Sequence, residues 1–188
     1  MADEIKVSIM PRLFTGLSLP ADIGFALSLK RGGLAGARWI DPENYHITLR
    51  YMGDIDGRVA DEVAEGLDML TGIEPFPLTL SHLGVFGGNK PRALYAGLDP
   101  SEPLDRLQAS QERLLQRLGL EPEGRKFVPH VTLARLRETN AADLARHIAH
   151  AGQFMPLSFT VDRFVLFSSR ESVGGGPYVV EEDYVFQP

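Results

Sequence analysis

The chain has 188 residues, of which 44% are hydrophobic and 23% are charged, a composition typical of a compact soluble domain with a real core. It contains no cysteine, which excludes a disulfide framework, a thiol nucleophile and a zinc site with thiolate ligands. A net charge of −6 argues against an extended nucleic-acid groove, which would carry a broad basic face, but leaves room for a local basic patch.

Membrane and export signals are missing from the sequence pattern. No run approaches the roughly 18 to 20 apolar residues of a membrane helix. The opening MADEIKVSIMPR carries acidic residues where a signal peptide needs positive charge. We therefore expect a cytoplasmic protein without a membrane segment.

In chain order, clusters of Gly, Pro and polar residues divide the sequence into alternating strands and helices. Strands are expected near residues 12–18, 46–51, 77–86, 92–98, 130–136, 157–168 and 178–186. Helices are expected at 20–30, at 57–70, from a Ser101 cap to Leu118, and from a Thr139 or Asn140 cap to His150.

Three segments recur in the same order, about 80 residues apart. The pairs are RLFTGLSLPAD from Arg12 with RALYAGLDPSE from Arg92, HITL from His46 with HVTL from His130, and PLTLSHLGVF from Pro77 with PLSFTVDRFVLF from Pro156. The repeat predicts a duplicated α+β unit, with halves of roughly 10–90 and 91–188 packed about a pseudo-twofold axis in one domain of residues 1–188. The alternative is that strands and helices resemble one another by pattern alone.

The two His-x-Thr-Leu motifs are the most informative residues in the chain. A shuffled sequence of this composition would contain only about 0.025 such tetrapeptides, so chance is a poor explanation. Each motif lies in an apolar, β-prone stretch, where alternation puts the histidine and threonine on one face. The intervening apolar residues, Ile47, Leu49, Val131 and Leu133, should point into the core.

Two imidazoles and two hydroxyls that face each other across a cleft suit an in-line displacement at phosphorus. One histidine can deprotonate the attacking water and the other can protonate the leaving oxygen, while hydroxyls hold the phosphoryl oxygens. Imidazole serves in either state near neutral pH. A lone strand histidine is more often structural, but the pairing favours function. A metal site is the other alternative, although there is no His-Glu-x-x-His motif and no cysteine that would support one.

Around these motifs the sequence resembles the two-histidine phosphoesterase superfamily and, within it, the RNA 2′,3′-cyclic phosphodiesterases, first described as 2′-5′ RNA ligases. The similarity covers nearly the whole chain. It is carried by RLFTGLSLP, WIDPENYHITLRYMGDI, PRALYAGL, GRKFVPHVTLARLR and FVLFSSR. The resemblance implies a bilobal α+β fold, with two antiparallel sheet lobes, helices on the outside and a central cleft, which uses no metal and no other cofactor.

The resemblance also implies roles for individual residues. His46 would be the general acid that protonates the departing 3′ oxygen, and His130 the general base that activates water, although the near-symmetry leaves these roles open to exchange. Thr48 and Thr132 would hold phosphoryl oxygens. Arg135, which matches the arginine of the HVTLAR pattern, would add a charge-assisted contact. The product would be a 2′-phosphate.

Further substrate-binding residues are expected beside the two motifs. Phe127 and Tyr51 could stack on a nucleobase, and Arg50 is a further candidate for contact with the substrate. Arg135 belongs to a local group of four cations, with Arg125, Lys126 and Arg137. Strict alternation puts Arg135 on the opposite face from His130, unless a bulge turns it inward.

The expected partner is an RNA end or a nucleotide that carries a 2′,3′-cyclic phosphate, and the expected state is a monomer. Two alternatives stay open at this point. The same site could join a cyclic phosphate to a 5′ hydroxyl as a 2′-5′ RNA ligase, or the chain could be a non-catalytic RNA-end binding module. Both His-x-Thr pairs are intact, which argues against the second alternative.

Overall fold

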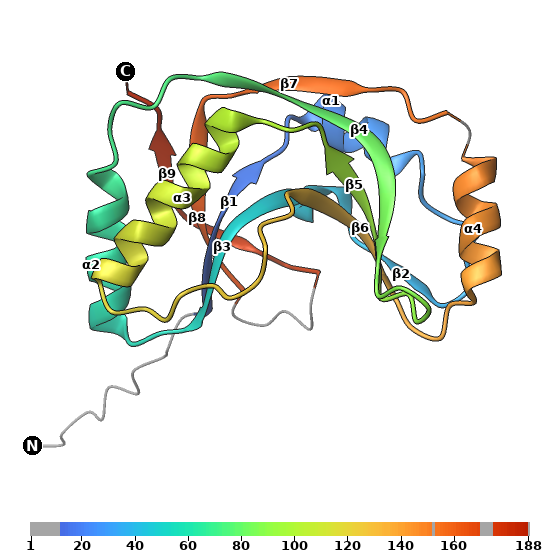
Figure 1. Cartoon of the computed structure of the whole chain (residues 1–188), viewed down its shortest axis with the longest axis horizontal. Coiled ribbons are helices and arrows are strands. Elements are labelled where there is room, and N and C mark those ends of the chain that lie inside the picture. The colour runs from blue at the N-terminus through green and yellow to red at the C-terminus, as the bar shows by residue number, and fades with distance from the viewer. Residues whose placement is uncertain (1–11, 152, 170–174, 188) are drawn as a thin grey trace, which may run out of the picture.

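The computed structural model describes residues 12–151, 153–169 and 175–187 (Figure 1). The opening segment, on which part of the predicted location rests, lies outside these residues. No helix in the described part of the chain is long and apolar enough to cross a membrane.

The strands of the described ranges form one antiparallel sheet at the centre of the molecule (Figure 1). Its strands are β1 (Arg12–Ser18), β2 (Ala37–Trp39), β3 (His46–Asp54), β4 (Phe76–Phe86), β5 (Ala93–Leu98), β6 (His130–Leu136), β7 (Leu157–Val161), β8 (Arg163–Ser168) and β9 (Val179–Val185). Eight of them follow the order β7-β4-β5-β6-β3-β1-β8-β9, and β2 pairs with β6.

The middle of this sheet is the contact between β3 and β6, which pair through Ile47 and Val131. On either side of the contact the repeated segments occupy matching places, since β1 lies beside β3 and β5 lies beside β6. The next strands outward are β8 and β4, which come from the second and the first half of the chain, respectively. The α+β class is confirmed, whereas the two lobes and the halves 10–90 and 91–188 stay predictions.

Within the described residues, four α-helices and one short 3₁₀ turn accompany the sheet. They are α1 (Ala21–Ser28), α2 (Gly57–Asp68), α3 (Glu102–Arg117), α4 (Ala141–His150) and the 3₁₀ turn η1 (Pro42–Asn44). Asp56, Ser101 and Asn140 cap α2, α3 and α4 by accepting hydrogen bonds from backbone N–H groups of the first turn. Thr139, the alternative cap for α4, instead donates its hydroxyl to the carbonyl of Ala35.

Two features of the sheet differ from the sequence-based expectation. The stretch 157–168 forms two strands separated by Asp162, because β7 pairs with β4 whereas β8 pairs with β1. The three-residue strand β2 was not expected, since so short a segment carries no period.

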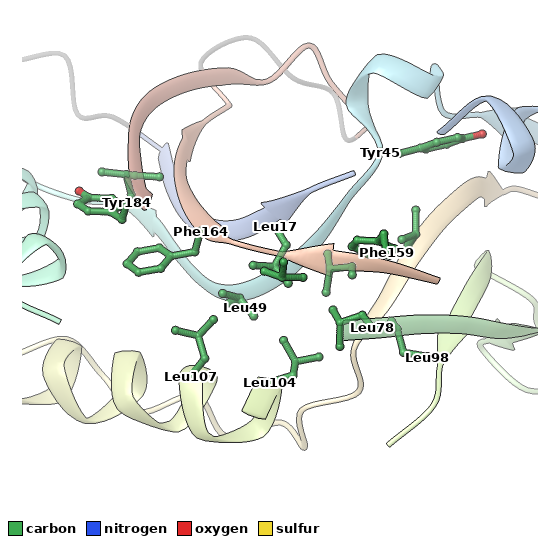
Figure 2. Close-up of a cluster of buried hydrophobic side chains, with 14 of the residues drawn as sticks. Leu17, Tyr45, Leu49, Leu78, Leu98, Leu104, Leu107, Phe159, Phe164 and Tyr184 are labelled. Atoms are coloured by element: carbon green, nitrogen blue, oxygen red, sulfur yellow. The ribbon is translucent and has the colours of Figure 1, made fainter. Parts of the chain in front are cut away.

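The main hydrophobic core packs side chains of α1, α2 and α3 against the sheet, and Figure 2 shows the part beside α3. Leu104 and Leu107 project from α3 toward Leu49 and Phe164 of the sheet (Figure 2). All four of these side chains are buried, so α3 is fixed against the face of β3 that lies opposite the histidines.

A buried polar network strengthens the same contact. Thr15 of β1 donates a hydrogen bond of 2.6 Å to Oε1 of Gln111. The Arg50 guanidinium forms an ion pair with Glu112 of α3 and also donates to the carbonyls of Tyr51 and Glu121. Arg50 therefore ties β3 both to α3 and to the loop that precedes β6.

We predict that Arg50→Ala lowers the free energy of unfolding by about 3 kcal/mol, because it leaves a largely buried carboxylate and two carbonyls without their donor. The matched control is Arg58→Ala, which breaks the exposed ion pair with Glu62 and should cost at most about 0.5 kcal/mol. Urea unfolding of both variants measures the difference, and equal losses would contradict a structural role for Arg50.

Candidate active site

A cavity of about 790 Å³ lies on the face of the sheet where β3 and β6 meet. All four residues of the two His-x-Thr pairs line it. The rest of the wall comes from β1, β3, β5 and β6, from the segments that precede β3, β5, β6 and β9, from the ends of β4 and β8, and from α3. These residues are Arg12, Phe14, Ile40, Asn44, Leu49, Tyr51, Phe86, Arg92, Ala93, Gln108, Glu123, Arg125, Lys126, Phe127, Val128, Arg135, Ser169, Gly175 and Tyr178.

The β3–β6 contact brings the two motifs together. The paired residues, Ile47 and Val131, are the second residues of HITL and HVTL, and both are fully buried. Because side chains alternate along a strand, the histidine and threonine of each motif project to the other face, into the cavity. This is the face that the sequence predicted for them.

One extra residue follows each His-x-Thr pair. The pairing of β1 with β3 skips Leu49, and the pairing of β5 with β6 skips Leu133, as in a β-bulge. Each bulge reverses the alternation, so the fifth residue after each histidine lines the cavity. These residues are Tyr51 and Arg135. The bulge that would turn Arg135 inward is therefore present.

The same reversal moves Arg50 away from the cavity. Arg50 was expected to contact the substrate, but it does not line the cavity and its guanidinium lies in the buried network with Glu112. Its counterpart in β6, Ala134, is likewise buried, in a small cluster with Leu144 of α4.

His46 is held in one orientation by its backbone and by aromatic rings. Its Nδ1 lies 2.9 Å from the carbonyl oxygen of Asn44, which can only accept, so Nδ1 carries the proton and Nε2 has the lone pair. The Thr48 hydroxyl lies 3.1 Å from Nε2. Phe14, Phe167 and Tyr178 surround the imidazole, with centroid distances of 5.0, 5.7 and 4.8 Å.

His130 has a similar setting. Its Nδ1 donates to the carbonyl of Val128 at 2.7 Å, which again leaves the lone pair on Nε2. Phe86 and Tyr95 contact the ring at centroid distances of 4.8 and 5.3 Å. The two histidines thus share a tautomer fixed by a carbonyl two residues earlier in the chain.

Burial favours the neutral form of both histidines. The pKa of His46 is lowered to about 4, chiefly by burial and also by the nearby His130 and Arg135, against the opposing effect of the Asn44 carbonyl. The pKa of His130 is also lowered, chiefly by burial and then by Arg135, while the Val128 carbonyl raises it. Each Nε2 can therefore accept a proton, and a bound anion would favour the protonated form.

The charge of the cavity wall is predominantly positive. Arg12 forms an ion pair with Asp54, and Arg125 forms one with Glu123. Arg92, Lys126 and Arg135 have no ion pair with any described residue. Phe127 and Tyr51, the two expected stacking residues, also line the wall. The expected group of four cations is only partly gathered here, because Arg137 does not line the cavity.

Sequence reasoning missed several residues of the site. The aromatic rings around His46 come from three different segments, and no local pattern marks Phe14, Phe167 or Tyr178 as neighbours of a histidine. Arg92 did carry a signal, because it opens a repeated segment as Arg12 does.

Among residues 12–151, 153–169 and 175–187, no three His, Asp or Glu side chains gather as a metal site would require.

Comparisons with known proteins give a consistent result. The family model described as the 2′-5′ RNA ligase superfamily matches residues 37–172. An RNA 2′,3′-cyclic phosphodiesterase of Thermotoga maritima is 31% identical over 161 residues, which cover 85% of this chain and 83% of that protein. A protein of the same name from Aquifex aeolicus is 31% identical, over 78% of this chain and 80% of its own length.

The fold recurs in solved structures. E. coli LigT complexed with 3′-AMP has a TM-score of 0.74 to this chain at 23% identity, covering 95% of this chain and 99% of that chain. The protein TT0787 of Thermus thermophilus has a TM-score of 0.75 at 24% identity, covering 93% and 97%. At these identities the likeness shows a shared fold.

The lowered pKa of His46 predicts a loss of stability in acid. Between pH 6.5 and 4 the unfolded chain binds a proton at this residue and the folded chain does not, so the free energy of unfolding falls as the pH falls, by up to about 3 kcal/mol. In His46→Gln this contribution should be absent. Urea unfolding between pH 7 and 4 measures it, with His82→Gln, outside the cavity, as control; identical pH profiles for H46Q and wild type would refute the prediction.

Proposed function

Because the chain belongs to the 2′-5′ RNA ligase superfamily and is similar over most of its length to RNA 2′,3′-cyclic phosphodiesterases, we propose that it hydrolyses RNA-terminal 2′,3′-cyclic phosphates. The proposed product is a 2′-phosphate, and the proposed mechanism is acid–base catalysis by two histidines without a metal ion. The observation that carries the proposal is the pair of carbonyl-oriented imidazoles, each with its threonine, in one cation-lined cavity.

In the proposed reaction, water attacks the phosphorus atom and the bond from phosphorus to the 3′ oxygen breaks. Nε2 of His130 takes the proton of the attacking water, and the protonated Nε2 of His46 donates its proton to the departing 3′ oxygen. The 2′ oxygen keeps the phosphoryl group. A later exchange of protons with solvent restores both imidazoles.

The low pKa of His46 sets the order of these steps. An acid must hold its proton, yet the imidazole is neutral in the empty cavity at neutral pH. The negative charge of the cyclic phosphate, bound where little water screens it, stabilises the imidazolium. Substrate binding and protonation of His46 are therefore coupled.

The remaining groups hold the substrate. The hydroxyls of Thr48 and Thr132 donate to the non-bridging phosphoryl oxygens, and Arg135 compensates the charge that develops on them. Tyr51 is 44% exposed, so its ring face is open to a base, and Phe127 provides a second surface. E. coli LigT complexed with 3′-AMP supports a nucleotide as ligand of this fold.

The proposed function predicts chelator-resistant turnover. Purified protein incubated with an RNA oligonucleotide that ends in a 2′,3′-cyclic phosphate, with excess chelator, should give a 2′-phosphate end. His46→Ala and His130→Ala should each lower kcat by about 10²- to 10⁴-fold. His82→Ala, outside the cavity, should change it little.

Other outcomes of this assay separate the alternatives. A 3′-phosphate product would mean that the 2′ oxygen leaves. A joined product, formed when an RNA with a 5′ hydroxyl is added, would favour ligation. Full activity in both histidine variants would rule out the two-histidine mechanism.

The proposed acid role of His46 predicts a pKa that responds to ligand. NMR titration of the histidine Cε1–H signals should show His46 with a pKa of about 4 in the free protein. Saturation with a nucleoside 2′-phosphate should raise that pKa by at least about one unit, since an opposite charge within reach favours the charged form. An unchanged pKa in the complex would argue against His46 as the acid.

A further inference from the structure

We propose that Arg92 forms a second anion site in the cavity, which binds a phosphate on the 5′ oxygen of the nucleoside that carries the cyclic phosphate. This rests on the proposed function. The ligand group is either the phosphodiester to the preceding nucleotide of an RNA chain or the 5′-phosphate of a free nucleotide, which offer the guanidinium the same oxygen atoms.

The backbone of Arg92 is fixed at the end of the cavity. Its N–H donates to the carbonyl of Phe86 at 2.8 Å, and its carbonyl accepts from the N–H of Leu136 at 2.8 Å. The next residue, Ala93, pairs directly with Arg135. Arg92 therefore lies beside Arg135 on the neighbouring strand, with both side chains in the cavity wall.

The positions of these two arginines extend the positive charge away from the histidines. Arg135 is three residues beyond Thr132, at most roughly 10 Å along the strand, and Arg92, the residue before β5, lies about one strand spacing, roughly 5 Å, to the side. A phosphate held by the threonines and Arg135 would therefore leave Arg92 within reach of a second phosphate. The cavity of about 790 Å³ lies toward the upper end of the range for small-molecule sites, so it has room for more than the reacting group.

The repeated segments do not give both ends of the cavity the same charge. Arg12 opens the matching segment, but Asp54 neutralises it through contacts of 3.2 and 3.3 Å. The residue that corresponds to Arg135 there is Tyr51, which is uncharged. Arg92 has no ion pair or side-chain hydrogen bond with any residue of the described ranges.

Because neither Arg92 nor Arg135 has an ion pair with a described residue, the two cations together attract an anion that binds between them or beside them. At the Arg12 end a carboxylate of the chain neutralises the cation. At the Arg92 end a phosphate of the substrate would do so. The cavity is therefore polarised, and the 5′ side of the substrate points toward β5.

Three substrates test the site by their kcat/KM values: a nucleoside 2′,3′-cyclic phosphate, the same compound with a 5′-phosphate, and a dinucleotide that ends in the cyclic phosphate. Wild type should prefer at least one of the phosphate-bearing substrates over the nucleoside compound by about tenfold, the scale of one charge-assisted contact. A preference for the dinucleotide alone identifies the phosphodiester as the ligand group, and an equal preference identifies any 5′-phosphate.

Arg92→Gln should remove most of this preference, and Arg92→Lys should keep part of it because the charge is retained. Arg12→Gln is the matched control, since it removes the same charge from the other end of the same cavity; it should leave the preference unchanged. In a plot of the logarithm of this preference against the logarithm of the salt concentration, the slope should be smaller by about one in R92Q than in wild type.

Equal kcat/KM values for all three substrates in wild type would overturn the site, as would an equal effect of R12Q and R92Q. If no cyclic phosphate is hydrolysed, the proposed function fails, and calorimetric binding still decides about the site. A nucleoside 2′,5′-bisphosphate should then bind more tightly than the 2′-phosphate in wild type but not in R92Q, and equal affinities in wild type would overturn the proposal.

Discussion

The pairing of Ile47 with Val131 at the middle of the sheet is the contact on which the site depends. Both residues are the second of their motif and both are fully buried. Their pairing therefore fixes the register of β3 against β6 and also the face of the sheet to which each histidine points. A slip of one residue would turn the histidine of one strand into the core and an apolar side chain into the cavity. The cost of burying an imidazole without its carbonyl partner, added to the loss of apolar burial, holds the register. The placement of both imidazoles on the cavity face therefore follows from the burial of Ile47 and Val131 on the other face.

Beyond this contact, two bulges give the strands the same change of facing but different side chains. The extra residues Leu49 and Leu133 place Tyr51 and Arg135 in the cavity wall. The fourth residue after each histidine turns the other way, where Arg50 binds α3 and Ala134 packs against α4. The matching bulges thus place an uncharged aromatic side chain at one end of the cavity and a cation at the other. An asymmetric substrate such as a ribose with a cyclic phosphate needs that difference.

Much of this could be predicted from the sequence, because the residues concerned carry local patterns. The seven expected strands and four expected helices match observed elements, apart from the division of 157–168, and the alternation around each histidine placed the apolar neighbours in the core. Arg50 is a residue whose facing cannot be predicted from local alternation. Alternation puts it on the face of His46 and Thr48, but the bulge at Leu49 depends on pairing with β1, a partner distant in sequence. The three rings around His46 and the bonds from Arg50 to Glu112 and Glu121 are likewise contacts between distant segments, which no local window contains.

The aromatic surroundings and the cations act on the histidines in the same direction, and this explains why they occur together. Burial by Phe14, Phe167 and Tyr178 disfavours the imidazolium of His46, and the charge of Arg135 disfavours it further. The same low-dielectric setting strengthens the attraction between a bound phosphate and every positive group around it. An anion therefore reverses both effects at once, since it compensates Arg135 and stabilises the protonated imidazole. A more exposed histidine would hold its proton more readily without the phosphate but would gain less from it, so in the proposed reaction the burial that costs stability in acid also makes protonation of His46 depend on the phosphate.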